Sequence, residues 1–431
     1  MRRKNESGMA LCITAGHARG LPNHQPEEVL QLLWYVKFVC QYNLPLVTPG
    51  LILIAKSKIS QLGESLLFVM GGADRIGNHF NDVHLLDTSK WEWVSTGLEN
   101  RAGQSAPRAR SGHSAIDMDN SGSGALIFGG ADLQRQQMFS DIFLFKMDAT
   151  GGGFWTEVMP SSSGITAQAR NAHTATWIPS SLGERMIVFG GTTEDGPTNE
   201  VLVLHYTMAT DSTEVIRNVY WTAASCSGTP PRAREMHSAT YCPHADGASV
   251  VIVGGRFETE EVANDVWILQ IQSLESASDK MLWSRLEDLP GPRCGHSAVI
   301  LPFAAGFTLV CSNSNSGDAS TRLDAAGYLV VFGGIDGAAF PTGVTVRDPN
   351  SKSLLTRTTS SLWSYEEVEP AIPERFSHAA VQVAIKNTKN TADAAPEAAV
   401  VSKVTPAMLV YGGLNVQEDI TDVAAISLRC I

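Results

Sequence analysis

The stretch Leu126-Ile-Phe128-Gly129-Gly130 decides the fold of this chain, because its pattern occurs six times. Each time, a short apolar run rich in Val, Ile and Phe ends in a double glycine. Successive double glycines lie 58, 61, 64, 79 and 79 residues apart, and such self-similarity indicates a repeat architecture. The glycines are Gly71, Gly72, Gly129, Gly130, Gly190, Gly191, Gly254, Gly255, Gly333, Gly334, Gly412 and Gly413.

Short apolar runs bounded by turn residues predict buried β-strands rather than helices. The double glycine that ends each run permits a positive φ and lets neighbouring backbone approach closely. We therefore interpret these glycines as structural residues of the repeat.

An arginine three residues before a histidine precedes five of the six double glycines. A small residue and then alanine usually follow the histidine, which is typical of the start of another strand. The pairs are Arg110 and His113, Arg170 and His173, Arg234 and His237, Arg293 and His296, and Arg375 and His378.

Two further landmarks follow the double glycines and complete a unit of four short strands. The first is a polar, acidic and apolar triplet, as in Asn81-Asp-Val, Ser140-Asp-Ile, Asn199-Glu-Val, Asn264-Asp-Val and Thr421-Asp-Val. The second is a tryptophan after a further turn, at Trp91, Trp93, Trp155, Trp221, Trp283 and Trp363. We expect these tryptophans to pack between units.

Four antiparallel strands with a double glycine after the second and an aromatic residue on the fourth resemble the kelch repeat of kelch β-propellers, the architecture of the galactose oxidase central domain. The resemblance implies an all-β ring of four-stranded blades around a central channel. Six double glycines then predict a six-bladed propeller, and we expect residues 29–431 to form it as a single domain.

The last unit ends before a fourth strand, which would leave an open sheet edge. In kelch propellers both ends of the chain commonly complete one blade. We assign the closing strand to residues 34–39, which begin with Trp34, and expect residues 1–28 to be a disordered leader. The first unit also departs from the pattern, because residues 49–55 contain neither the arginine nor the histidine.

Two insertions, at about 303–326 and 386–405, interrupt the spacing between first and second strands. Their Ser, Asn, Ala and Lys content predicts mobile surface loops on one face of the disc. The second-to-third and fourth-to-first connections lie on the other face, because the strands alternate in direction.

Composition narrows the class of partner. The chain has 431 residues, 43% of them hydrophobic and 18% charged, so it can bury a core. Its net charge of −12 argues against nucleic acid as a partner. Seven cysteines without a CxxC pair predict free thiols in the cytoplasm. No apolar run of about 18 uninterrupted residues occurs, so we expect no membrane span.

The histidines recur once per unit, which favours a repeated structural hydrogen bond over a metal or acid-base site. No nucleophile elbow, phosphate loop or dinucleotide fingerprint occurs, and no residues match the Cys, Tyr and His set of the copper oxidases. We therefore predict no catalytic residues, no metal and no cofactor. A carbohydrate-related kelch enzyme remains the alternative.

The five arginines, Arg110, Arg170, Arg234, Arg293 and Arg375, allow two interpretations. In the structural one, each guanidinium binds backbone carbonyls of a neighbouring blade. In the functional one, they form a basic rim around the channel mouth that binds an acidic peptide. We predict a monomeric, non-catalytic protein-interaction module or scaffold that uses the loops of its faces. The alternative within the same class is a substrate adaptor of a ubiquitin ligase.

Overall fold

The computed structural model describes the strands and most of the connections of residues 106–301, with shorter segments on either side. The described residues are 11–17, 52–55, 66–73, 78–87, 92–94, 106–117, 124–147, 152–178, 184–208, 216–244, 247–275, 278–301, 307–311, 321–325, 328–336, 344–347, 363–366, 379–387, 403–411 and 423–430. They form strands and turns, which confirms the all-β class. No helix in these ranges is long and apolar enough to cross a membrane.

Most of the described strands pair into antiparallel groups of four, which we number sheets 1 to 6, and further strands form short hairpins or extend sheet 4. Sheet 1 contains β2 (Ile52–Ala55), β3 (Leu66–Ala73), β4 (His79–Asp87) and β5 (Glu92–Val94). Sheet 2 contains β6 (Ser114–Asp117), β7 (Gly124–Phe128), β10 (Ile142–Met147) and β11 (Gly153–Val158). Sheet 3 contains β12 (Thr174–Ile178), β13 (Glu184–Phe189), β16 (Val201–Met208) and β17 (Ile216–Ala223).

The second half of the chain continues the same order. Sheet 4 contains β19 (Ser238–His244), β20 (Gly247–Arg256), β21 (Val262–Glu275) and β22 (Ser278–Arg285). Sheet 5 contains β23 (Ser297–Leu301), β26 (Tyr328–Phe332), β27 (Val344–Arg347) and β28 (Trp363–Glu366). Sheet 6 contains β29 (Ala379–Asn387), β30 (Lys403–Tyr411), β31 (Val423–Cys430) and β1 (Leu11–His17).

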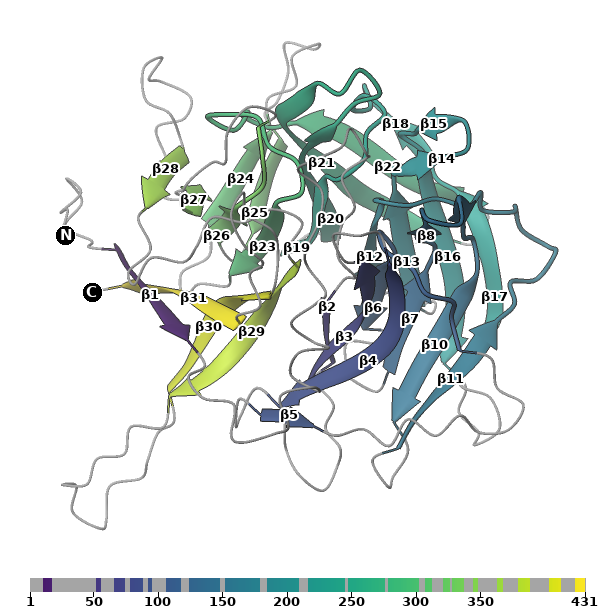
Figure 1. Cartoon of the computed structure of the whole chain (residues 1–431). Coiled ribbons are helices and arrows are strands. Elements are labelled where there is room, and N and C mark those ends of the chain that lie inside the picture. The colour runs from purple at the N-terminus through teal and green to yellow at the C-terminus, as the bar shows by residue number, and fades with distance from the viewer. Residues whose placement is uncertain are drawn as a thin grey trace.

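The first strands of neighbouring sheets contact one another. Moving along the chain, β2 contacts β6, β6 contacts β12, β12 contacts β19, β19 contacts β23 and β23 contacts β29. The strand β29 in turn contacts β2, as Figure 1 shows for the yellow and dark purple strands near the centre of the view. These are the contacts expected of sheets arranged around a common axis.

Aromatic residues fill the space between sheets. Trp221 on the fourth strand of sheet 3 packs on Phe128 of sheet 2, with ring centroids 4.9 Å apart. Trp283 of sheet 4 packs in the same way on Phe189 of sheet 3, at 5.2 Å. Both tryptophans are only 2% exposed, which confirms the predicted packing between units. Burying such large rings contributes much of the apolar area that stabilises the fold.

The double glycines adopt the conformation that the sequence required. Gly129 and Gly130 have φ of 65° and 93°, and the pairs at Gly71, Gly190, Gly254 and Gly333 repeat these positive values. A Cβ on Gly129 would lie 2.8 Å from the Arg170 carbonyl oxygen. Side chains are therefore excluded here by both φ and close approach. Gly412 and Gly413 lie outside the described residues.

The structure differs from the sequence analysis in the strand that completes sheet 6. Strand β1 pairs antiparallel with β31, from Leu11 opposite Cys430 to His17 opposite Ala424. Figure 1 shows purple β1 beside yellow β31. Part of the expected leader is therefore a strand, because the apolar, β-branched run at Leu11–His17 can satisfy the open edge of β31. Residues 34–39, which we had assigned to this position, lie outside the described residues.

The first insertion also differs from expectation, since it contains two strands rather than only a loop. Strands β24 (Phe307–Cys311) and β25 (Thr321–Ala325) pair antiparallel. β25 joins β19 at His244, so the insertion extends sheet 4. The run Phe307–Cys311 has the aromatic and β-branched content that favours strand formation. At the second insertion, the β29 and β30 ladder continues to Asn387 opposite Lys403, and residues 388–402 lie outside the described residues.

Connections that arrive from the preceding sheet cover the outer edges of sheets 3 and 4. The backbone N–H groups of Ser161 and Ile165 donate to the carbonyls of Val219 and Trp221 on β17, at 2.7 and 3.0 Å. Strand β18 (Ser225–Ser227) pairs in parallel with β22. Both covering segments pass tightly over the outer strand, since a Cβ on Gly164 or on Gly228 would lie within 2.4 Å of a tryptophan carbonyl oxygen.

We predict that removing residues 1–20 lowers the melting temperature by several degrees, because the deletion removes β1 and exposes the edge of β31. Removing only residues 1–8, which precede β1, should leave it unchanged. Thermal unfolding followed by tryptophan fluorescence compares the two truncations. Equal melting temperatures would show that β1 does not contribute to sheet 6.

Candidate functional site

The face built by the fourth-to-first and second-to-third connections carries the residues singled out from the sequence. Short bridges join the two kinds of connection within sheets 2 to 5. They pair Ser111 with Ala131, Asn171 with Thr192, Glu235 with Arg256 and Cys294 with Ile335. Each bridge places the residue that follows a repeated arginine beside the residue that follows a double glycine. We call this surface the arginine face.

The repeated arginines lie beneath this face and not on it. Arg110, Arg170 and Arg234 have no exposed surface, and Arg293 is 1% exposed. In each, Nη1 donates to the carbonyl of the first glycine of the double glycine in the same sheet, at 2.8 to 3.1 Å. These carbonyls belong to Gly129, Gly190, Gly254 and Gly333. The same sheet, rather than a neighbouring one, therefore supplies the carbonyl.

In sheets 2, 3 and 4 the acidic residue of the triplet supplies the counter-charge. Arg110 and Arg234 bind both carboxylate oxygens of Asp141 and Asp265, with Nη2 distances of 2.9 and 2.8 Å. Arg170 donates to Glu200 at 2.9 Å. Such forked pairs fix the guanidinium plane, and they are strong because both partners are charged. Burial raises the pKa of Asp265, but hydrogen bonds from Arg234 outweigh this effect and hold the pKa below its usual value.

The backbone of each arginine binds the preceding sheet. Gly72 of sheet 1 donates its N–H to the Arg110 carbonyl at 2.9 Å, and Arg110 donates its own to the Phe80 carbonyl at 3.0 Å. The same two bonds recur one sheet further on, where Arg170 joins Gly130 and Phe139. One arginine residue thus joins two sheets, with its backbone bound to one and its side chain bound to the other.

This geometry supports the structural interpretation of the arginines. A side chain without exposed surface cannot contact a partner unless the loop around it opens, and its charge is already paired within the chain. The described residues therefore provide no basic rim at these positions. Arg375 lies outside them, as does His378.

The repeated histidines form a second buried layer that connects neighbouring sheets. His173 Nε2 lies 2.9 Å from Ser114 Oγ, His237 Nε2 lies 2.8 Å from Thr174 Oγ1, and His296 Nε2 lies 2.9 Å from Ser238 Oγ. In every case the hydroxyl belongs to the preceding sheet. These contacts confirm the predicted repeated hydrogen bond, and no group of metal-ligating side chains occurs within the described ranges.

Burial keeps His113, His173 and His237 neutral. It lowers the pKa of His113 and of His237 to about 3, and the charges of Arg110 and Arg234 lower these pKa values further. Burial, followed by the charge of Arg170, likewise lowers the pKa of His173 well below its usual value. A neutral imidazole suits a buried bond to an uncharged hydroxyl.

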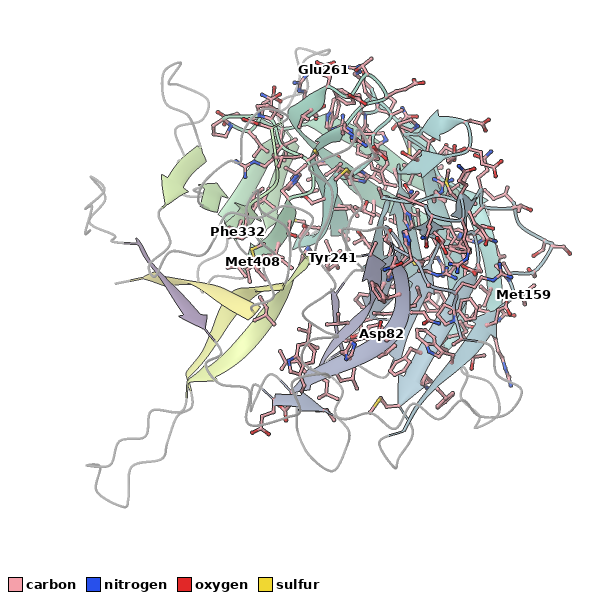
Figure 2. The ribbon with its side chains drawn as sticks, viewed as in Figure 1. Asp82, Met159, Tyr241, Glu261, Phe332 and Met408 are labelled. Atoms are coloured by element: carbon pink, nitrogen blue, oxygen red, sulfur yellow. The ribbon has the colours of Figure 1, made fainter. Side chains whose placement is uncertain are left out.

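The sequence analysis did not single out the hairpins that project above the buried layers. In sheet 2 the hairpin of β8 (Ala131–Asp132) and β9 (Gln137–Met138) carries Arg135, whose side chain is 68% exposed. In sheet 3, β14 (Thr192–Thr193) and β15 (Gly196–Pro197) flank the exposed Glu194 and Asp195. In sheet 4 the corresponding turn carries Glu258 and Glu261, and Figure 2 shows Glu261 at its upper tip.

The signal for these hairpins was the part of each unit that does not repeat. Between the double glycine and the acidic triplet, both length and residue type change from unit to unit. A pattern search discards such segments because they have no common residues. One charged pair also occurs at the bridged positions, where Glu235 binds Arg256 and accepts a hydrogen bond from Thr192.

Comparison with known proteins agrees with this architecture. The family model described as the Attractin/LZTR1 beta-propeller matches residues 67–326, more than half of the chain. The chain belongs to this β-propeller family. Its match includes the buried arginine and histidine layers of sheets 2 to 4, and these layers are therefore part of a propeller framework.

Several curated proteins are similar to about half of this Attractin/LZTR1-type chain. An acyl-CoA-binding domain-containing protein of Arabidopsis thaliana is 24% identical over 241 residues, which cover 54% of the chain and 32% of that protein. Host cell factor 1 of Rattus norvegicus is 24% identical over 54% of the chain and 12% of its own length. An F-box/kelch-repeat protein of Arabidopsis thaliana is 28% identical over 54% of the chain and 47% of its own length. The last confirms the kelch resemblance, and each match spans less than half of the relative.

We predict that Arg234→Ala lowers the free energy of unfolding by about 3 to 5 kcal/mol, because it leaves the carboxylate of Asp265 buried without its partner. Arg232→Ala is the matched control. Arg232 is 58% exposed and pairs with the equally exposed Glu261, so its loss should cost less than about 1 kcal/mol. Urea unfolding measures both. Similar losses in the two variants would contradict the structural role of the buried arginine.

We predict that stability falls steeply between pH 6.5 and about 4. The histidine pKa values lie lower in the folded state than in the unfolded state. The unfolded chain therefore binds more protons below pH 6.5, and each buried histidine costs about 1.4 kcal/mol per pH unit. Asp265, whose folded pKa lies below its usual value, contributes only once the pH falls to about 4, the reference pKa of an aspartate in an unfolded chain. Urea midpoints at pH 7.5, 6.5 and 5.5 test this, and His237→Gln should make the slope shallower. A constant midpoint would contradict it.

Proposed function

We propose that this propeller is a protein-interaction module whose partner binds the arginine face through the hairpins above the buried arginine layer. The hairpins are the β8 and β9 hairpin of sheet 2, the β14 and β15 hairpin of sheet 3 and residues 257–261 of sheet 4. A rigid scaffold with variable loops allows specificity to change without loss of the fold.

The contrast between buried and exposed residues carries this proposal. Repeated residues, such as Arg170 and His173, lie within the face and are paired inside the chain. Residues that differ between sheets, such as Arg135, Glu194 and Glu258, lie at its exposed hairpins. A surface that is identical in every sheet could not distinguish partners, so recognition falls to the non-repeating hairpins.

The proposed module is one closed six-bladed ring. The contacts among the first strands, including the contact of β29 with β2, support closure. The pairing of β1 with β31 supports a sixth blade made from both ends of the chain. A closed ring would hold the hairpins at fixed separations, which reduces the entropy lost when a partner binds.

The prediction of an acidic partner rested on the five arginines. Since the guanidinium groups of Arg110, Arg170 and Arg234 are paired with carboxylates of the chain, the proposal keeps a protein partner but not its acidic character. The monomeric state and the absence of catalysis stay predictions. A cytoplasmic location is supported by the free thiols of Cys226, Cys242 and Cys294.

The relatives suggest what kind of protein such a module serves. The name of the F-box/kelch-repeat protein combines a propeller repeat with an F-box. By analogy, a substrate adaptor of a ubiquitin ligase is the second candidate, and it would use the same face to bind its substrate. The matched region is only part of each relative.

Affinity purification with hairpin variants tests the proposal. We expect the wild-type chain to retain a protein that Glu194→Arg and Glu258→Arg lose, because each reverses an exposed charge on the arginine face. Glu157→Arg is the control, since Glu157 is an exposed residue of β11 away from the hairpins. A partner retained by all three variants would place recognition elsewhere. A partner lost only by Glu157→Arg would also place recognition away from the hairpins.

A further inference from the structure

The first sheet does not have the side-chain framework that recurs in sheets 2 to 5. In those sheets an arginine binds the carbonyl of the double glycine, as Arg110 binds Gly129. Sheet 1 has its double glycine, Gly71 and Gly72, but the chain contains no arginine between Arg19 and Arg75. Sheet 1 therefore has no guanidinium from a preceding Arg-x-x-His segment that could bind the carbonyl of its double glycine.

The acidic residue of the first triplet contacts a histidine of its own strand. Asp82 occupies the position of Asp141, Glu200 and Asp265, which bind arginines in their sheets. Instead, Asp82 lies 2.7 Å from Nε2 of His84, and the two side chains are 38% and 30% exposed. An exposed pair of this kind contributes much less than a buried forked pair.

The buried histidine of sheet 2 shows the consequence on the other side of the junction. His173, His237 and His296 each contact a hydroxyl of the preceding sheet. His113 occupies the equivalent position and is 3% exposed, yet neither of its ring nitrogens has a hydrogen-bond partner. The segment 49–55, Pro49-Gly-Leu-Ile-Leu-Ile-Ala55, contains no Ser or Thr that could supply the hydroxyl.

Other contacts still hold the first two sheets together. The backbone bonds of Arg110 to Gly72 and Phe80 are retained, and the Phe68 ring packs on Trp155 with centroids 6.4 Å apart. A non-repeating contact also occurs, because His79 Nδ1 lies 3.5 Å from an oxygen of Asp132 in the β8 hairpin. The junction is therefore formed, but it lacks the histidine–hydroxyl bond that crosses the later junctions, and sheet 1 lacks the arginine that would bind its own double glycine.

We propose that the fold has a built-in opening point at the junction of sheets 1 and 2, which separates at a lower free energy than the corresponding junctions between sheets 2, 3 and 4. Opening there exposes no buried arginine pair of sheet 1, and it breaks no histidine–hydroxyl bond. It frees His113 to reach a hydrogen-bond partner in water, which offsets part of the cost. Local opening concentrates where such specific interactions are fewest.

The opening point has a direct relation to the arginine face. Because His79 of sheet 1 contacts Asp132 of the β8 hairpin, separation of the two sheets also releases one support of that hairpin. Sheet 1 and the hairpin would then open together, while the hairpins of sheets 3 and 4 keep their positions. The proposal does not depend on which partner binds.

Native-state hydrogen exchange with mass spectrometry tests the location of the opening. Peptides that cover β3 and β4 should exchange at least about tenfold faster than those that cover β13 and β16, since tenfold corresponds to a difference of about 1.4 kcal/mol in opening free energy. Both pairs are central strands of their sheets, so they form a matched comparison. Equal exchange rates in sheets 1 and 3 would overturn the proposal.

A matched pair of substitutions tests its cause. His113→Leu should leave the urea midpoint unchanged or raise it, because it removes polar atoms that are buried without partners. His173→Leu should lower the ratio of folded to unfolded chain by roughly five- to a hundredfold, because it breaks the bond to Ser114. A loss in His113→Leu as large as that in His173→Leu would overturn the proposal, even if exchange in sheet 1 were fast.

Discussion

The position of the guanidinium group beneath the arginine face is the constraint on which the other features depend. In sheets 2 to 4 it lies between a double-glycine carbonyl and a carboxylate, while the backbone of the same residue binds the preceding sheet. The glycines must have positive φ and no side chain to leave room for this arrangement. The arginine, the double glycine and the acidic residue of the repeat are thus parts of one interaction, which explains why they recur together.

Much of the fold could be predicted because it repeats. Double glycines and apolar runs located the strands, and Trp221 and Trp283 pack between sheets as expected. The strand that completes sheet 6 could not be located in the same way, since an outer strand needs only an apolar, β-branched segment in reach, and Leu11–His17 satisfies this without any landmark. Trp34 favoured residues 34–39 for this position, because a tryptophan marks the fourth strand of the repeated units.

The candidate site was harder to predict for the opposite reason. Recurrence drew attention to residues such as Arg170, but recurrence reports what every sheet needs in order to fold, and this residue is buried and paired. Residues that distinguish the sheets, such as Arg135 and Glu258, have no common pattern to find. Their importance becomes visible only when the buried layer below them is known, because only then is the exposed surface defined.

The tight segments over the outer edges of sheets 3 and 4 have a consequence for solubility. They occupy hydrogen-bonding groups of β17 and β22 that would otherwise be available to strands of another molecule. Gly164 and Gly228 make this cover possible, since a methyl group at either position would collide with a tryptophan carbonyl. A substitution at these glycines would therefore act far from the arginine face, by uncovering a template for intermolecular sheet growth and so promoting aggregation of otherwise folded molecules.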